Sequence, residues 1–304
     1  MDDLRQNDGV VANVLDGDSP IFDPVDWRLS DFEAALCAET RSLAAGRFAA
    51  RAPGIDRAAK FPTENYADLH ANDLMGICIP KHYGGRGADL RAYMLAAAEI
   101  GRYCGATALT FNMHVSSCLW TGFLADNLAM SADQRTSHDA MRQRHYHRIL
   151  EEGAIYAQPF SEGGDAAAGK TAFGTTALVA DGGWIINGRK IFASLSGYAD
   201  YYGVLCTELA TADATKSRAN TMYIAIDSRA AGVSVEGDWD PLGMRGTVSR
   251  TLVFKDVFVP FEEQLMPRGV YFNAARQWPH MFMTLTPSYM GIAQAAYDFT
   301  IRYL

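Results

Sequence analysis

The feature that most constrains the fold is a change of hydrophobic period, because it divides the chain into blocks of different secondary structure. From Ala154 to Pro260, short apolar runs alternate with turn-forming residues, which is typical of β-strands. On both sides of this block, apolar residues recur at the 3.6-residue spacing of helices. We therefore predict an α+β protein, with an N-terminal helical domain, a central β-sandwich or barrel domain, and the start of a C-terminal helical domain.

The predicted boundaries follow the positions at which the period changes. The first residues are acidic and contain no apolar segment of the kind that a signal peptide requires. The expected parts are a flexible tail at 1–25, the N-terminal helical domain at 26–150, the middle β domain at 151–266, and the first helix of a truncated C-terminal helical domain at 267–304.

Local signals predict how individual elements begin and turn. Ser30, followed three residues later by Glu33, predicts a helix N-cap with a capping box. The stretches Asp181-Gly182-Gly183 and Asn187-Gly188 lie between apolar runs and predict two hairpin turns.

The end of the chain carries a helical stripe of apolar residues. The spacing predicts that one face contains Ile292, Ala295, Ala296, Phe299 and Tyr303. Because the sequence provides no visible partner for this face, we expect a further helical domain after Leu304.

Charge and cysteine content exclude several classes of function. A net charge of −8 disfavours nucleic acid and anionic membranes as partners. No run of about 18 apolar residues is present to span a membrane. The five cysteines are an odd number without a C-x-x-C pair, which fits a reducing cytoplasm and no metal site.

Four stretches carry a shared pattern of glycines, aromatic residues and hydroxyl residues over most of the chain. They are Gly76 to Leu90 (GICIPKHYGGRGADL), Ile155 to Asp165 (IYAQPFSEGGD), Asn187 to Asp200 (NGRKIFASLSGYAD) and Leu242 to Pro260 (LGMRGTVSRTLVFKDVFVP). In this order and spacing, the chain resembles the acyl-CoA dehydrogenase superfamily of flavoproteins. The third stretch is similar to that family's Asn-Gly-x-Lys-x-Trp-Ile-Thr/Ser motif.

The resemblance implies an FAD-dependent oxidoreductase of fatty acid or lipid metabolism. It would perform α,β-dehydrogenation of an acyl-CoA or other acyl thioester, with hydride transfer to flavin N5. An electron-transfer flavoprotein would be its partner, and the full-length protein would form a homo-tetramer or homo-dimer. Two alternatives stay open: a two-component flavin-dependent monooxygenase of the same fold, or a non-catalytic subunit of a hetero-oligomeric dehydrogenase.

The resemblance also assigns flavin-binding residues. A flat isoalloxazine ring needs an apolar wall and donors near N5 and the pyrimidine oxygens. Phe192 replaces the family's tryptophan as this wall, and Ser194 supplies the hydroxyl near N5. In isolation, the two residues would equally suit a plain hairpin, as a core phenylalanine and a serine that bonds the backbone. The remaining implied contacts are backbone groups of Tyr156 and Ala157, the side chain of Gln158, and close backbone approach at Gly163 and Gly164.

Several positions depart from the family pattern. The family's catalytic glutamate lies beyond Leu304 in most members, and Met281, which cannot accept a proton, occupies the alternative base position. Pro279 and Phe282 stand where the family contacts the CoA ester. No catalytic residue is therefore predicted within this chain. Arg245 has two interpretations, as a contact to substrate or phosphate, or as an arginine that ties down a β loop.

Overall fold

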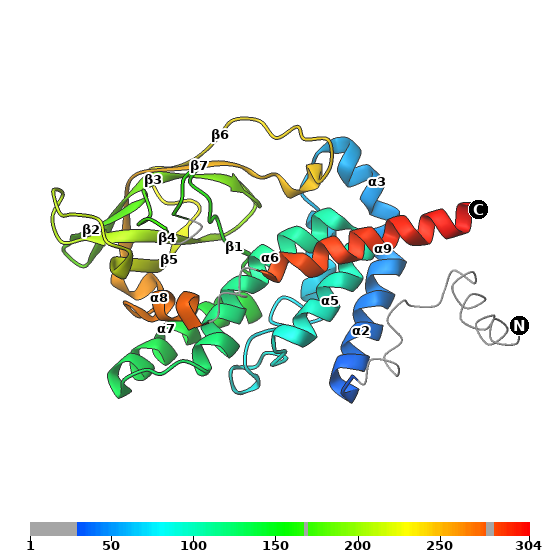
Figure 1. Cartoon of the computed structure of the whole chain (residues 1–304), viewed down its shortest axis with the longest axis horizontal. Coiled ribbons are helices and arrows are strands. Elements are labelled where there is room, and N and C mark those ends of the chain that lie inside the picture. The colour runs from blue at the N-terminus through cyan, green and yellow to red at the C-terminus, as the bar shows by residue number, and fades with distance from the viewer. Residues whose placement is uncertain (1–28, 167–169, 278–282) are drawn as a thin grey trace, which may run out of the picture.

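The computed structural model describes residues 29–166, 170–277 and 283–304. Within these ranges the β-sheet lies at one side of the molecule and most of the helices at the other (Figure 1). The predicted tail at 1–25, and Pro279, Met281 and Phe282, lie outside the described residues.

The N-terminal part is helical, as predicted. The Ser30 side chain accepts a hydrogen bond from the Glu33 amide at 3.3 Å, and the Glu33 carboxylate accepts one from the Ser30 amide at 2.8 Å. The predicted capping box is therefore confirmed. The elements are α2 (Asp31–Leu43), η1 (Ala44–Phe48), α3 (Ala49–Ala58), α4 (Thr63–Ala71), η2 (Lys81–Tyr83), α5 (Leu90–Tyr103), α6 (Gly105–Leu119), η3 (Trp120–Leu124) and α7 (Ala132–Leu150).

The glycines of the first motif make a tight turn before α5. Gly84 has a φ of +93°, a conformation that L side chains rarely adopt. At Gly85, a Cβ atom would overlap the carbonyl oxygen of Ile79. These two glycines therefore serve the packing of the turn.

Within the described residues, the central part is one eight-stranded sheet in the order β6-β7-β3-β2-β4-β5-β8, with β1 pairing parallel to β4. All other pairs are antiparallel except β2 with β4. The α+β class is confirmed, and the strands form a single hydrogen-bonded sheet. They are β1 (Tyr156–Ala157), β2 (Thr176–Ala180), β3 (Gly183–Ala193), β4 (Tyr201–Leu209), β5 (Thr221–Asp227), β6 (Val233–Glu236), β7 (Arg250–Pro260) and β8 (Gln264–Met266), with short turns η4 (Arg218–Asn220), η5 (Arg245–Thr247) and η6 (Phe261–Glu263).

One of the two predicted hairpin turns is wrong. The turn at 181–183 does connect β2 to β3, because Ala180 pairs with Gly183. Asn187 and Gly188, however, lie inside β3, where β2 and β7 flank the strand on both sides. The Asn187 side chain bonds Asp256 of β7 through both its amide atoms, so it supports an irregularity in the sheet rather than a turn.

The C-terminal part contains α8 (Val270–Gln277) and α9 (Thr286–Tyr303). Helix α9 packs on α5 through small residues, since a Cβ atom at Gly291 would overlap the Ala98 carbonyl oxygen. Asp298 also forms an ion pair with Arg102 of α5 at 2.6 Å. The predicted apolar stripe lies largely outside this packed face, in line with the expectation that the sequence provides no partner for it. The buried residues of α9 are Pro287, Ser288 and Gly291, whereas Ala296, Phe299 and Tyr303 are exposed.

Candidate functional site

Strand β3 ends in a bulge that turns Phe192 away from the sheet. The register with β7 shifts between Lys190 and Ala193, and Phe192 has a φ of +51°. Bulges re-aim side chains and are frequent beside functional sites. The ring of Phe192 is 67% exposed, so it is not the core phenylalanine that a plain hairpin would contain.

Trp239 stands beside Phe192 and was not predicted from the sequence. The two rings meet edge to face, with centroids 6.2 Å apart. The indole Nε1 donates a hydrogen bond to the Met244 carbonyl at 3.3 Å, which fixes the loop that carries the ring. Because the contact joins residues far apart in the sequence, no local signal could have identified it.

Ser194 begins a chain of buried hydroxyls. Its Oγ lies 2.8 Å from Ser249 Oγ, which in turn lies 2.7 Å from Thr247 Oγ1. Thr247 donates to the Met244 carbonyl at 2.9 Å. Each hydroxyl has one proton, and Thr247 donates its own to Met244. Ser249 therefore donates to Thr247, and Ser194 donates to Ser249. Donation from Ser194 to a ligand would therefore require rotation of its hydroxyl.

Strained backbone gathers where these two loops meet. Leu195, Met244 and Val248 have φ values of +65°, +60° and +46°. The loops are joined by hydrogen bonds from the Leu195 amide to the Thr247 carbonyl and from the Ser196 amide to the Val248 carbonyl, at 3.0 and 3.2 Å. Left-handed conformations of non-glycine residues are costly and cluster at ligand sites.

The strand β1 carries the residues expected at the polar edge of the ring. Tyr156 and Ala157 are fully buried. The Tyr156 amide already donates to His114 Nδ1 at 3.0 Å, so that amide is not open to a ligand. Gln158 is buried, and its Nε2 has no hydrogen-bond partner among the described residues. A buried donor without a partner is unfavourable unless a ligand or water satisfies it.

The loop after Gln158 is tied to the bulged strand. The Ser161 carbonyl accepts a hydrogen bond from the Ile191 amide at 2.8 Å. Glu162 forms an ion pair with Lys190 at 2.7 Å, and Lys190 also donates to the Leu205 carbonyl at 2.7 Å. The second and third motifs, about 30 residues apart, are therefore brought together, as the resemblance implied.

The ion pair has opposing electrostatic effects on its two members. Burial lowers the pKa of Lys190, and the attraction of Glu162 only partly offsets this effect. Burial raises the pKa of Glu162, but the charge of Lys190 and the hydrogen bonds from Lys190 and Thr175 hold it below its ordinary value.

The two glycines of the loop differ in their surroundings. Gly163 has a φ of +83°, and a Cβ atom there would lie 3.5 Å from Ile191. Gly164 has open space where a Cβ atom would stand. Only Gly163 is therefore required by its backbone conformation.

Arg245 is held by the chain itself. Its Nη1 lies 2.5 Å from the Asp240 carboxylate, and its Nε donates to the Asp56 carbonyl at 3.0 Å. These contacts favour the structural interpretation, in which the arginine ties the loop before β7 to α3.

No group of three or more His, Cys, Asp or Glu side chains in the ranges that the structure covers could hold a metal ion. None of the helices described is both long enough and apolar enough to cross a bilayer.

These residues provide, on two segments that are hydrogen-bonded to each other, the kinds of group that bind a planar aromatic ligand with a polar edge. Phe192 offers an exposed ring, Gln158 offers a buried donor that lacks a partner, and the loop at 158–165 is fixed against the bulge. These are the features that a flavin ring requires of its site.

Comparisons with known proteins match this chain to two domain families. The acyl-CoA dehydrogenase N-terminal domain matches residues 30–129, and the acyl-CoA dehydrogenase middle domain matches residues 160–257. The short-chain specific acyl-CoA dehydrogenase of Clostridium acetobutylicum is 27% identical over 272 residues, or 90% of this chain. The chain spans 66% of that relative's length.

Solved structures show the same arrangement. FMN-bound TdsC from Paenibacillus sp. A11-2 superposes with a TM-score of 0.70 at 26% identity, over 86% of this chain and 63% of TdsC. KijD3 in complex with dTDP superposes with a TM-score of 0.71 at 21% identity, over 94% of this chain and 67% of KijD3, which supports the fold.

Proposed function

Because the chain belongs to the acyl-CoA dehydrogenase family of flavin oxidoreductases, we propose that it holds FAD against Phe192 and serves the α,β-dehydrogenation of an acyl thioester. The observation that carries the proposal is the buried Nε2 of Gln158, which lacks a partner on a loop tied to the Phe192 bulge.

Each residue has a part in this proposal. Phe192 covers one face of the ring, and Gln158 donates to a pyrimidine oxygen. The Ser194 hydroxyl rotates from Ser249 to donate near N5. Gly163 lets the backbone approach the ligand closely. Once bound, the flavin would accept the hydride that leaves the β carbon of the acyl chain.

No proton acceptor for the α carbon is assigned. Met281 holds the alternative base position, and a thioether cannot act as a base at neutral pH. We propose that the whole protein supplies the base, the contacts to an electron-transfer flavoprotein and the contacts between its own copies. We also propose that it acts in the cytoplasm.

A second candidate is a two-component flavin-dependent monooxygenase. It is favoured by the methionine at the base position and by the likeness to TdsC, whose solved structures include one named dibenzothiophene monooxygenase. A non-catalytic subunit is the third candidate, because such a subunit would also dispense with a base.

Anaerobic addition of acyl-CoA to the FAD-loaded protein distinguishes these candidates. Loss of the flavin absorbance supports the dehydrogenase. Unchanged absorbance, together with hydroxylation of an aromatic substrate after a flavin reductase and oxygen are added, supports the monooxygenase. The non-catalytic subunit is supported if the protein purifies without flavin and its complex with an active partner stays active after Ser194→Ala.

Replacing Phe192 with alanine is expected to weaken FAD binding by about tenfold, because an aromatic wall contributes roughly 1–1.5 kcal/mol. Titration of the apoprotein with FAD, followed by fluorescence, measures the effect. Phe258→Ala is the matched control, because Phe258 is also an exposed aromatic on the β3–β7 pair, at its opposite end. Equal affinities for the two variants would contradict the assignment of the wall.

Replacing Gly163 with valine is expected to lower the bound flavin to a tenth or less of the wild-type content, because a β-branched residue does not accept a φ of +83°. The absorption spectrum of the purified protein reports the flavin content. Gly164→Ala serves as the control, since its Cβ enters open space. A yellow Gly163→Val protein with one flavin per chain would mean that this loop is not at the ligand.

A further inference from the structure

Tyr156, the residue two positions before Gln158, is held by histidines from two different helices. The Tyr156 amide donates to His114 Nδ1 of α6 at 3.0 Å. The Tyr156 hydroxyl lies 2.9 Å from His145 Nδ1 of α7. Both histidines are buried. The backbone and the side chain of one residue are thus fixed separately.

The second nitrogen of each ring decides the tautomer. His114 Nε2 lies 2.9 Å from the Met75 carbonyl, and His145 Nε2 lies 3.0 Å from the Gln264 carbonyl. A carbonyl oxygen only accepts, so Nε2 carries the proton in both rings. Each Nδ1 is therefore an acceptor, and the Tyr156 amide and hydroxyl are the donors.

Strand β1 depends on these contacts because it is so short. It consists of two residues, and within the described part of the chain its ladder pairs it only with β4. On the side of α6, the Tyr156 amide has His114 as its acceptor. Loss of that acceptor would bury an unsatisfied amide two residues before Gln158, and the strand would shift to satisfy it.

We propose that His114 is a positioning residue for the flavin, because its Nδ1 fixes the strand that places the Gln158 donor at the edge of the ring. His145 supports the same strand through the Tyr156 hydroxyl. This inference rests on the proposed function, since the placement of Gln158 matters to a flavin only if the chain binds one.

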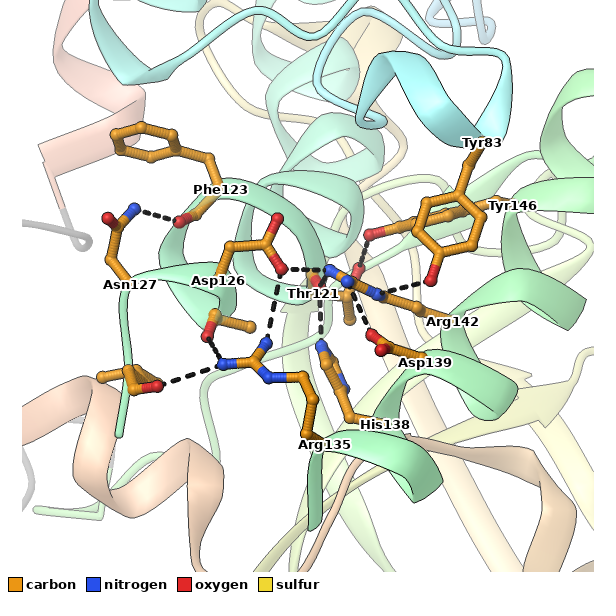
Figure 2. A network of polar contacts seen from close by, with 12 residues as sticks. Tyr83, Thr121, Phe123, Asp126, Asn127, Arg135, His138, Asp139, Arg142 and Tyr146 are labelled. Atoms are coloured by element: carbon orange, nitrogen blue, oxygen red, sulfur yellow. Dashed lines mark hydrogen bonds and ion pairs between the residues drawn. The ribbon is translucent and has the colours of Figure 1, made fainter. Parts of the chain in front are cut away.

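His138 provides a matched control in the same helical domain. It is also fully buried, and its Nε2 donates to the Thr121 carbonyl at 2.8 Å (Figure 2). Its neighbours in this network are Arg142 and Asp126, and its hydrogen bond among the described residues goes to Thr121 rather than to Tyr156. Its loss should weaken the fold without moving Gln158.

The test compares amide replacements at position 114. Asparagine places an acceptor near Nδ1, toward Tyr156, whereas glutamine places a group near Nε2, toward Met75. We expect His114→Asn to bind FAD within about threefold of wild type and His114→Gln to bind at least about tenfold more weakly. His114→Gln should also shift the visible absorption spectrum of the bound flavin. His138→Asn, which removes the Nε2 donor to the Thr121 carbonyl, should lower the urea midpoint but leave the affinity within about twofold.

The outcomes separate the two proposals. If the wild-type chain binds neither FAD nor FMN, the proposed function fails and the positioning role fails with it. If wild type binds FAD and the two amide variants at position 114 have equal affinities and spectra, the positioning role alone is overturned. The same conclusion follows if His138→Asn weakens FAD binding as much as His114→Gln, because a loss of stability would then explain both.

Discussion

Between pH 7 and pH 5, the free energy of unfolding is expected to fall by about 2 kcal/mol for each of three buried histidines. Burial lowers the pKa of His114, His138 and His145 from 6.5 to about 4, and the charge of Arg142 adds to the effect at His138. Hydrogen bonds to backbone groups, and the charge of Glu263 at His145, only partly oppose it. All three are therefore neutral in the folded protein at pH 5, whereas in the unfolded chain they bind protons below pH 6.5.

The direction of the effect follows from proton binding. In this window the unfolded state binds more protons than the folded state, so acid favours unfolding. The stabilising contribution is complete above pH 6.5 and is lost as the pH falls toward 4. Carboxylates with lowered pKa values, such as Glu162 and Glu263, also make acid favour unfolding. Their effect begins only as the pH approaches 4.5, the ordinary pKa of the group.

Urea unfolding at pH 7, 6 and 5 measures this dependence. The slope between pH 6 and pH 5 should approach the uptake of three protons, or about 4 kcal/mol per pH unit at most. The variant His138→Gln should lower that slope, because one fewer proton is taken up on unfolding. A free energy of unfolding that stays constant from pH 7 to pH 5 would show that these rings are hydrated or already charged in the folded protein.

Much of the architecture could be predicted because it depends on local patterns. The capping box at Ser30 uses two residues of one helical turn, and the strands follow from short apolar runs between turn signals. The error at Asn187 has a physical cause. An Asn-Gly pair favours a turn in isolation, but two flanking strands and bonds to Asp256 outweigh that preference.

The candidate site was predicted only in part, because some of its members are joined by contacts between distant segments. Phe192 and Gln158 were assigned from motif positions, and their contacts with a flavin stay predictions. Trp239 and His114 were not assigned roles, since nothing in the sequence near Trp239 shows that it meets Phe192 across the loop. Likewise, the bond from the Tyr156 amide to His114 spans 42 residues and depends on how α6 docks on β1.

Replacing Glu162 with glutamine is expected to destabilise the protein by about 3–5 kcal/mol, because it leaves a buried ammonium without its counter-charge. The Lys190 side chain is 0% exposed and Glu162 is 10% exposed. The Leu205 carbonyl and the face of the Phe173 ring would be the neighbours left to stabilise the charge. The amides of Gly174 and Thr175, which donate to Glu162, would also lose a charged acceptor.

The adjacent residue supplies the control for this experiment. Arg189 and Glu236 form an ion pair at 3.1 Å with side chains that are 60% and 50% exposed, so Arg189→Gln should change stability by less than about 1 kcal/mol. Adding Lys190→Met to Glu162→Gln should recover part of the loss, since the unpaired charge is then removed. If Glu162→Gln and Arg189→Gln are equally mild in urea unfolding, the pair is not buried as described. In that case, the ion pair does not hold the loop at 158–165 against β3, and the hydrogen bond from the Ile191 amide to the Ser161 carbonyl is the tie that the described residues leave between them.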